Sequence, residues 1–134
     1  MSARTGRLLA VDLGARTAET REIPAATMDA YLGGRGLGAK LLHDSGRHRR
    51  DPFDPSVPMI LATGPLTGTA APTSARTSLT AISPLTNTLF DANSGGHAGI
   101  RLKRSGFDAL WIEGAADAPL ILVVDQGTVR FEDA

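Results

Sequence analysis

Glycine and proline divide this chain into short segments. The sequence carries 15 Gly and 8 Pro among 134 residues, and the turn-rich run Gly64-Pro65-Leu66-Thr67-Gly68-Thr69 cannot be helical. The longest strongly apolar stretch, residues 118–124, is far shorter than the ~20 residues of a membrane-spanning helix. We therefore expect one domain, residues 1–134, built from short strands and short helices and without a membrane span.

Strand patterns recur along the chain, and they do not alternate regularly with helices. Short helices are expected near residues 24–32, 37–44 and 98–104. The strands are expected at residues 7–13, 17–23, 59–62, 77–82, 89–92, 109–113, 120–125 and 128–132. This order predicts an α+β fold with mostly antiparallel sheets and two or three short helices. The last strand ends with the chain, which predicts an open sheet edge that another chain, a second copy or further sequence would cover.

Composition excludes several classes of function. Lys and Arg number 14 and so do Asp and Glu, and this balance argues against a nucleic-acid partner. The absence of cysteine means that the chain itself can hold no disulfide, zinc–thiolate site or iron–sulfur cluster. Residues 8–11 are too short for the apolar part of a signal peptide, so we expect a cytoplasmic protein.

The run Asn93-Ser94-Gly95-Gly96 is a candidate anion site between a predicted strand and a predicted helix. Glycines let an anion approach the backbone closely, and the first N–H groups of a helix have no intrahelical acceptor. The run lacks the Gly-Lys-Ser/Thr of the Walker pattern. The alternative is a plain strand-to-helix turn capped by Asn93 or Ser94.

Two arginines adjoin other glycine-rich loops. Arg76 ends the hydroxyl-rich run 64–75, and its planar guanidinium suits a phosphate or the carbonyl of a flat heterocycle. Arg35 lies in the run Gly33-Gly34-Arg35-Gly36-Leu37-Gly38 and could reach a bound anion. The alternatives are an ordinary ion pair for Arg76, and a helix–helix turn in which Arg35 faces solvent.

Catalytic groups are few. His43, His48 and His97 are the three histidines, and Asp91 and Asp108 are single carboxylates without a visible partner in the sequence. No nucleophile–base–acid arrangement is recognisable. His97, at the start of a predicted helix, either contacts a ligand or is structural, and we assign no catalytic residue.

Taken in order, these motifs resemble the N-terminal domain of the tungsten-containing aldehyde ferredoxin oxidoreductases. The resemblance extends from about Gly6 to the end of the chain. The motifs are Gly33-Gly34-Arg35-Gly36-Leu37, Gly64-Pro65-Leu66-Thr67-Gly68-Thr69, Ala71-Pro72-Thr73 with Arg76, Ser83-Pro84-Leu85-Thr86, Asn93-Ser94-Gly95-Gly96 and Gly106-Phe107-Asp108-Ala109. The resemblance implies a β-rich base for a tungsten (or molybdenum) bis-pterin cofactor, in enzymes that oxidise an aldehyde with water to a carboxylic acid and pass electrons to ferredoxin.

The resemblance also implies roles for individual residues. Arg76 would contact a pterin, and Gly95 would present its backbone N–H to it. Asn93 would help bind the Mg²⁺ ion that bridges the pterin phosphates, with Ser94 and Gly96 in the same turn. Magnesium prefers oxygen ligands, so one amide oxygen is a reasonable contribution. To these cofactor-binding candidates we add Arg35, on its chemistry alone.

Members of this family are several times longer than this chain. Their cluster cysteines and second pterin-binding segment lie in parts that these 134 residues do not contain. We therefore expect the chain to act only with the remaining oxidoreductase domains, or with a partner subunit that carries the iron–sulfur cluster and delivers electrons to ferredoxin. The alternative is a non-catalytic binding or interaction module that keeps the scaffold. A generic nucleotide binder is disfavoured, because no acidic ribose-reading residue follows a glycine-rich turn at the expected spacing.

Overall fold

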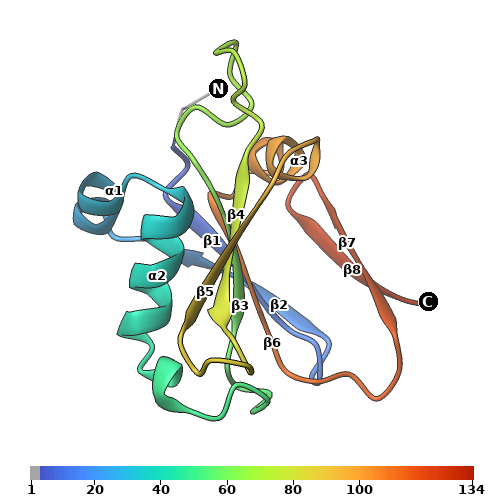
Figure 1. Ribbon diagram of the computed structural model, residues 1–134. Helices are drawn as coiled ribbons and strands as arrows, with labels where there is room; N and C mark the ends of the chain where they lie inside the picture. Colours follow the sequence, from blue (N-terminus) through green and yellow to red (C-terminus); the bar gives the residue numbers. More distant parts are fainter. Residues whose placement is uncertain (1–3) are drawn as a thin grey trace.

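A six-stranded sheet with strand order β2-β1-β6-β3-β4-β5 forms the centre of the computed structural model, which describes residues 4–134 (Figure 1). Residues 1–3 of the expected domain lie outside the described residues. The elements in chain order are β1 (Arg7–Asp12), β2 (Thr17–Glu22), α1 (Ala25–Tyr31), α2 (Gly34–Asp44), the 3-10 turn η1 (Arg47–Arg49), β3 (Met59–Thr63), β4 (Thr77–Ile82), β5 (Leu89–Ser94), α3 (Ala98–Arg104), β6 (Ala109–Glu113), β7 (Leu120–Asp125) and β8 (Thr128–Asp133).

The predicted fold class is confirmed. Within the sheet only β1 and β6 pair in parallel; the other neighbouring strands are antiparallel. β7 and β8 form a separate two-stranded sheet. No helix within residues 4–134 has the length and apolar character that crossing a membrane requires.

Strand β1 carries apolar side chains toward both faces of the sheet, because both faces are covered at this strand. Leu8 and Ala10 point to one face and Leu9 and Val11 to the other, and all four are buried. A strand buried on both faces is expected to read as a continuous apolar run rather than as an alternating one. The run Leu8-Leu9-Ala10-Val11 has this character.

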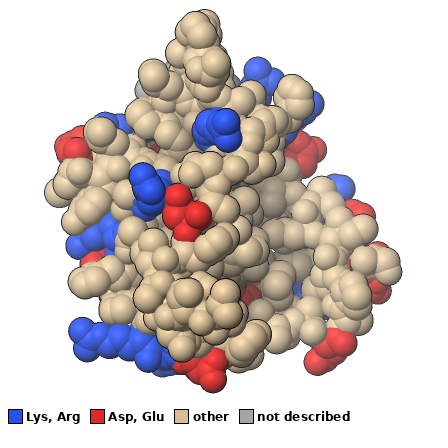
Figure 2. Space-filling model, viewed as in Figure 1, with Lys and Arg blue, Asp and Glu red and all other residues tan. Residues whose placement is uncertain are grey.

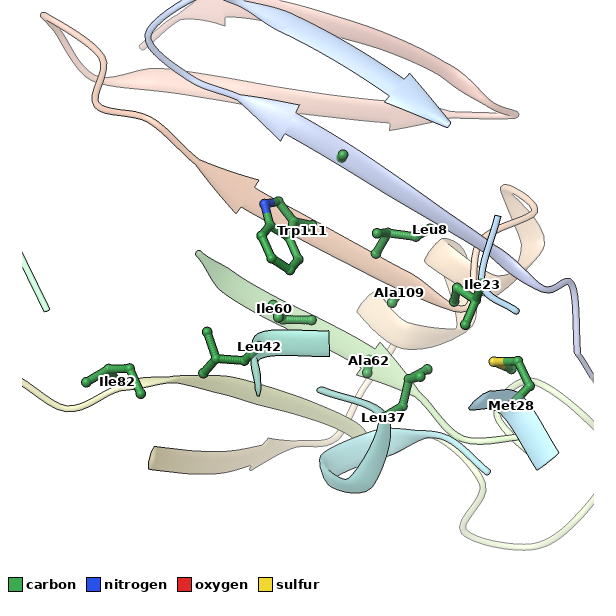
Figure 3. Close-up of a cluster of buried hydrophobic side chains, with 11 residues drawn as sticks. Leu8, Ile23, Met28, Leu37, Leu42, Ile60, Ala62, Ile82, Ala109 and Trp111 are labelled. Carbon is green, nitrogen blue, oxygen red and sulfur yellow. The ribbon is translucent and has the colours of Figure 1, made fainter. Parts of the chain in front are cut away.

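Helices α1 and α2 cover the first face of the sheet (Figure 1). Figure 3 shows the side chains that they enclose with the strands; these are Leu8, Ala10, Ile23, Met28, Leu37, Leu42, Ile60, Ala62, Ile82, Ala109 and Trp111. α2 lies very close to β4, because Gly38 faces Thr80 where even one methyl group would overlap the threonine side chain. This close packing ties α2 to the strand that follows the predicted Arg76 loop.

The second face of the sheet is covered less completely, by α3 and by the β7–β8 hairpin. Leu9, Val11, Phe107 and Leu110 are buried there. Several apolar neighbours are only partly buried; these are Leu13, Leu61, Ile112, Leu122, Val124, Val129 and Phe131. Figure 2 shows a hollow between the hairpin and the main body, where a cavity of about 460 Å³ lies among residues of β1, β2 and β8.

Several expected boundaries differ from the structure by one residue, and two differ by more. α2 begins at Gly34 rather than near Leu37, because Gly33, with a φ of 150°, lets the chain reverse directly after α1. β5 continues through Asn93 and Ser94, which pair with Ser78 and Thr77 and therefore belong to the sheet rather than to a turn. The alternative in which Asn93 or Ser94 caps α3 is wrong, since the cap position is His97, without a side-chain cap bond.

A buried ion pair joins the start of the chain to the end of α3. The Asp108 carboxylate accepts hydrogen bonds from the backbone N–H groups of Thr5 and Gly6, both at 2.7 Å, and from Lys103 Nζ. Asp108 is fully buried and Lys103 is 3% exposed. Asp108, which shows no partner in the sequence, therefore holds three segments together: the residues before β1, α3, and the loop that enters β6.

Removing this carboxylate should destabilise the chain strongly. Asp108→Ala leaves the Lys103 ammonium buried without a counter-charge, and such a change costs about 3–5 kcal/mol. Urea unfolding of the two proteins measures the difference. Asp44→Ala, which breaks an exposed pair with Lys40 in one helix, should cost less than about 1 kcal/mol. Equal losses in the two variants would contradict the role given to Asp108.

The same carboxylate should make stability depend on acid pH. Burial raises the pKa of Asp108, but the hydrogen bonds from Lys103 and from the backbone of Gly6 and Thr5 outweigh burial and hold the pKa below its ordinary value. The stabilisation is thus fully present above the unfolded-state pKa of about 3.9 and is lost as the pH falls through the lower folded-state value. Unfolding free energies from pH 6 to pH 2 should show a steeper acid decline for the natural chain than for Asp108→Asn; parallel curves would refute this.

Candidate functional site

The β4–β5 hairpin brings the predicted site residues to one end of the sheet. Thr77 pairs with Ser94 and Ser78 with Asn93. Arg76 directly precedes Thr77, and Gly95 directly follows Ser94, so the two segments run side by side where the hairpin ends near α3 (Figure 1). Residues 17 positions apart in the sequence are therefore neighbours in space.

Hydroxyl groups fold the loop that leads into Arg76. Thr67 Oγ1 accepts a hydrogen bond from the Gly64 N–H at 3.0 Å and donates to the Arg76 carbonyl at 3.2 Å. The Gly68 N–H donates to the Ser74 carbonyl at 3.4 Å. These bonds fix the backbone of Arg76, while its side chain is exposed and, within residues 4–134, has no carboxylate within 4.0 Å.

Glycines let the first predicted loop pack closely against the start of the second loop and against β4. A Cβ on Gly33 would lie 2.5 Å from the Thr63 carbonyl oxygen, directly before the Arg76 loop begins. A Cβ on Gly34 would lie 3.3 Å from Ser78 Oγ. The first glycine run thus contacts both the end of β3 and strand β4, which pairs with the Asn93 strand β5.

Side-chain contacts fix the orientation of Asn93. Its Oδ1 accepts from Ser78 Oγ at 2.9 Å, and its Nδ2 donates to Asp91 Oδ2 at 3.2 Å. A carboxylate can only accept, so Asp91 determines that the nitrogen end of the amide faces it. The amide oxygen is then directed away from Asp91 and keeps a second lone pair for a cation.

Arg35 lies beside this group but contacts its carboxylate. Its Nη1 is 3.8 Å from Asp91 Oδ2, and the Arg35 side chain is 71% exposed. Asp91, which shows no partner in the sequence, therefore has two: Arg35 and Asn93. The arrangement places Arg35 as the counter-charge of Asp91, and its exposed guanidinium is at the edge of the group.

Two buried oxygen atoms beneath Asn93 have no hydrogen-bond partner in the described residues. They are Asp91 Oδ1 and Thr80 Oγ1, on residues that pair across β4 and β5. Buried polar atoms in native proteins nearly always have a partner. Unsatisfied oxygens of this kind suit a water molecule or a hard cation.

The backbone at Gly95 and Gly96 is open. Added Cβ atoms there would meet no atom of the described residues within 4 Å, and Gly96 has a positive φ of 94°. Within residues 4–134 neither N–H group has a hydrogen-bond partner, and Ser94 Oγ bonds only to the Gly95 carbonyl, at 3.2 Å. The two N–H groups are therefore available to a ligand.

The site contains donors and oxygens but no visible proton-transfer machinery. His97 is exposed at the start of α3; His43 and His48 stack on each other, with ring centroids 5.2 Å apart, at the far end of α2. Residues 4–134 contain no group of three or more His, Cys, Asp or Glu side chains that could hold a metal ion. The arrangement can bind a planar, phosphate-bearing molecule, and any redox chemistry would come from that molecule.

Sequence reasoning missed Ser78, Thr80 and Asp91. The strand β4 alternates, and its residues Ser78, Thr80 and Ile82 share the face toward α2. Asp91 and Asn93 share that face on β5, two positions apart. Pairing the two predicted strands would have placed the four polar side chains together. The alternation of side chains along each strand therefore contained enough information to predict this polar group.

The chain matches known proteins over nearly its whole length. The family model described as "Aldehyde ferredoxin oxidoreductase, N-terminal domain" matches residues 8–134. The tungsten-containing aldehyde ferredoxin oxidoreductases of Pyrococcus abyssi and Pyrococcus horikoshii are 41% and 40% identical to it over 129 residues, which is 96% of this chain and 21% of each relative. A Pyrococcus furiosus protein named aliphatic sulfonate oxidoreductase, WOR-like subunit, is 32% identical over the full chain and 22% of its own length. The chain therefore spans about a fifth of the length of these relatives.

A solved structure shares the fold. The active site complex BamBC of benzoyl coenzyme A reductase, in complex with 1,5-dienoyl-CoA, superimposes with a TM-score of 0.93. Its sequence is 32% identical, and the match covers 98% of this chain and 20% of that one.

Two glycine substitutions should separate packing from ligand access. A methyl group at Gly99 would overlap Thr77 Oγ1, whereas one at Gly95 would meet open space. Gly99→Ala should therefore destabilise the chain by about 1–3 kcal/mol, and Gly95→Ala should change stability by less than about 0.5 kcal/mol. Thermal and urea unfolding measure both. A Gly95→Ala chain that is as unstable as Gly99→Ala would show that the loop is packed rather than open.

Proposed function

The chain belongs to the aldehyde ferredoxin oxidoreductase family, as a match to its N-terminal domain, and from this premise we propose that residues 1–134 form part of the base that binds a tungsten–pterin cofactor. One observation carries the proposal: Arg76, the Asn93 amide and the unpartnered N–H groups of Gly95 and Gly96 lie at one end of one hairpin.

The residues present fit such a group. A pterin with a phosphate needs donors for its anionic and carbonyl oxygens, and the guanidinium of Arg76 has no competing carboxylate within 4.0 Å in the described residues. Gly95 and Gly96 add backbone N–H donors in open space. The absence of Cβ atoms allows a flat molecule to approach this backbone closely.

A divalent cation fits beside Asn93. The unused lone pair of Asn93 Oδ1 would serve as one oxygen ligand of Mg²⁺, whose remaining ligands would be phosphates and water. The Asp91 carboxylate, only 13% exposed, would repel a phosphate nearby, and Arg35 at 3.8 Å offsets that charge. Arg35 would thus favour phosphate binding indirectly, by offsetting the charge of Asp91. Its exposed guanidinium is also a candidate for direct contact with the cofactor.

The chain's own part is binding and orientation. When bound, the cofactor would supply the two-electron oxidation of an aldehyde to a carboxylic acid, the activity that the relatives' name indicates. Arg76 and the Gly95–Gly96 backbone would hold the pterin, and Asn93 would fix its phosphate through the metal. We assign no residue of this chain to a proton-transfer step.

Further protein would complete the enzyme. The chain contains no cysteine, so an iron–sulfur cluster that passes electrons to ferredoxin would be held by other domains or by a partner subunit. The partly covered second face of the sheet, with the half-buried side chains of Leu61, Ile112 and Phe131, would pack against that additional protein. Activity is therefore proposed for the assembled enzyme and not for this chain alone.

Loss of Arg76 should reduce cofactor retention. In the complete enzyme that carries this domain, Arg76→Gln removes a charge-assisted contact to the cofactor, and losing about 1.5 kcal/mol corresponds to roughly tenfold weaker binding. Tungsten by elemental analysis and released pterin by fluorescence measure the effect on purified protein. Arg49→Gln, which removes another exposed guanidinium without a carboxylate within 4.0 Å in the described residues, is the matched control. Equal tungsten content in the two variants would contradict the role of Arg76.

A further inference from the structure

Three arginines that have no acidic partner among residues 4–134 gather at the end of α3 away from the proposed cofactor site. They are Arg7, Arg101 and Arg104. Within residues 4–134 most other basic side chains lie within 4 Å of a carboxylate, as do Arg4, Arg16, Arg21, Arg35, Lys40, Arg47, Arg50, Lys103 and Arg130. A chain of zero net charge that leaves three guanidiniums unpaired in one place has a local positive surface.

The three guanidinium-bearing residues line one cavity of about 780 Å³. It lies between the start of β1, the end of α3 and the tip of the β7–β8 hairpin, and Figure 1 shows that tip beside α3. A Cβ added to Gly127 at the tip would be 3.9 Å from the Ser105 carbonyl, so the two elements approach closely. Val123 and Val124 give the cavity an apolar wall. Its size is in the range of sites for nucleotide-sized ligands.

Arg7 is held in place before any ligand arrives. Its Nε donates to the Gly106 carbonyl at 3.1 Å, and its guanidinium carbon lies 5.6 Å from the centre of the Phe107 ring. A side chain at position 106 would collide with the Arg7 guanidinium, and Gly106 has a positive φ of 95°. One nitrogen is thus anchored, while the terminal nitrogens remain for an anion.

Helix capping does not account for the other two arginines. Basic residues near a helix C-terminus interact with its free carbonyls, but the Arg101 and Lys103 carbonyls already accept from the backbone N–H groups of Ser105 and Gly106. No hydrogen bond in the described residues joins the side chains of Arg101 or Arg104 to these carbonyls. Both guanidiniums are exposed, and neither has a carboxylate within 4.0 Å among residues 4–134.

We propose that this cavity binds a small polyphosphate, either pyrophosphate itself or the phosphate chain of a nucleotide-sized molecule. Three guanidiniums match the several oxyanions of such a ligand, and they outnumber Asp125, the one acidic residue on the wall. The site is distinct from the cofactor loop, because none of the residues that line the cavity belongs to residues 64–76 or 93–96. The proposal is therefore independent of cofactor binding at Arg76 and Asn93.

Calorimetric titration of the 134-residue chain with pyrophosphate and with ATP tests the proposal. We expect saturable binding with a Kd below about 1 mM that weakens as salt is raised. Arg101→Gln combined with Arg104→Gln should weaken binding about tenfold or more, and Gly106→Ala should also weaken it by displacing Arg7. Arg49→Gln, another unpaired and exposed arginine, should leave binding unchanged. Tighter binding of ATP than of pyrophosphate would identify the apolar wall as part of the site.

Two results would overturn the proposal. The first is the absence of saturable binding of either ligand, or equal losses in the Arg49 variant and the Arg101/Arg104 double variant. The second is binding that survives the double variant but is lost in Arg76→Gln, which would place the polyphosphate at the cofactor loop instead. Circular dichroism of each variant checks that the fold is intact. Failure of this proposal would leave the proposed cofactor site unaffected, since the two sites share no residue.

Discussion

The close packing of α2 on β4 is the constraint on which the rest of the site depends. Gly38 and Gly34 remove the side chains that would hold the helix away from Thr80 and Ser78. The helix can therefore bring the first glycine run against the end of β3 and place Arg35 beside Asp91. A bulkier residue at position 38 would move the helix, and with it one wall of the polar group around Asn93.

Much of the secondary structure could be predicted from short-range patterns in the sequence. Alternation and turn residues predicted all eight strands to within about two residues. Most strands present an apolar side to one of the two cores, whereas all six residues of β2 are exposed. The order of the strands in the main sheet, and the separation of the β7–β8 hairpin from that sheet, were beyond such patterns, since they depend on contacts between distant segments. The early start of α2 depends on a single backbone angle at Gly33 that composition does not reveal.

The residues of the candidate site also fall into those that local sequence predicts and those that depend on contacts between distant segments. Arg76 and Asn93–Gly96 were predicted from local chemistry and from the resemblance of ordered motifs, and the pairing of β4 with β5 places them together. Asp91 was missed because a lone carboxylate in a sequence shows no partner, whereas its partners come from α2 and from its own strand. The buried Lys103–Asp108 pair was missed for a related reason: a lysine near a helix end usually faces water.

In this account the chain supplies hydrogen-bond donors that would bind the cofactor, and the cofactor would supply the redox chemistry. The decisive measurement is a crystal structure of the complete enzyme with its cofactor. The account predicts that the Arg76 guanidinium and the Gly95 N–H lie within hydrogen-bond distance of the same pterin, with Asn93 Oδ1 on a cation that touches its phosphate. A pterin bound elsewhere, with Arg76 and Gly95 facing solvent or other protein, would contradict the central claim.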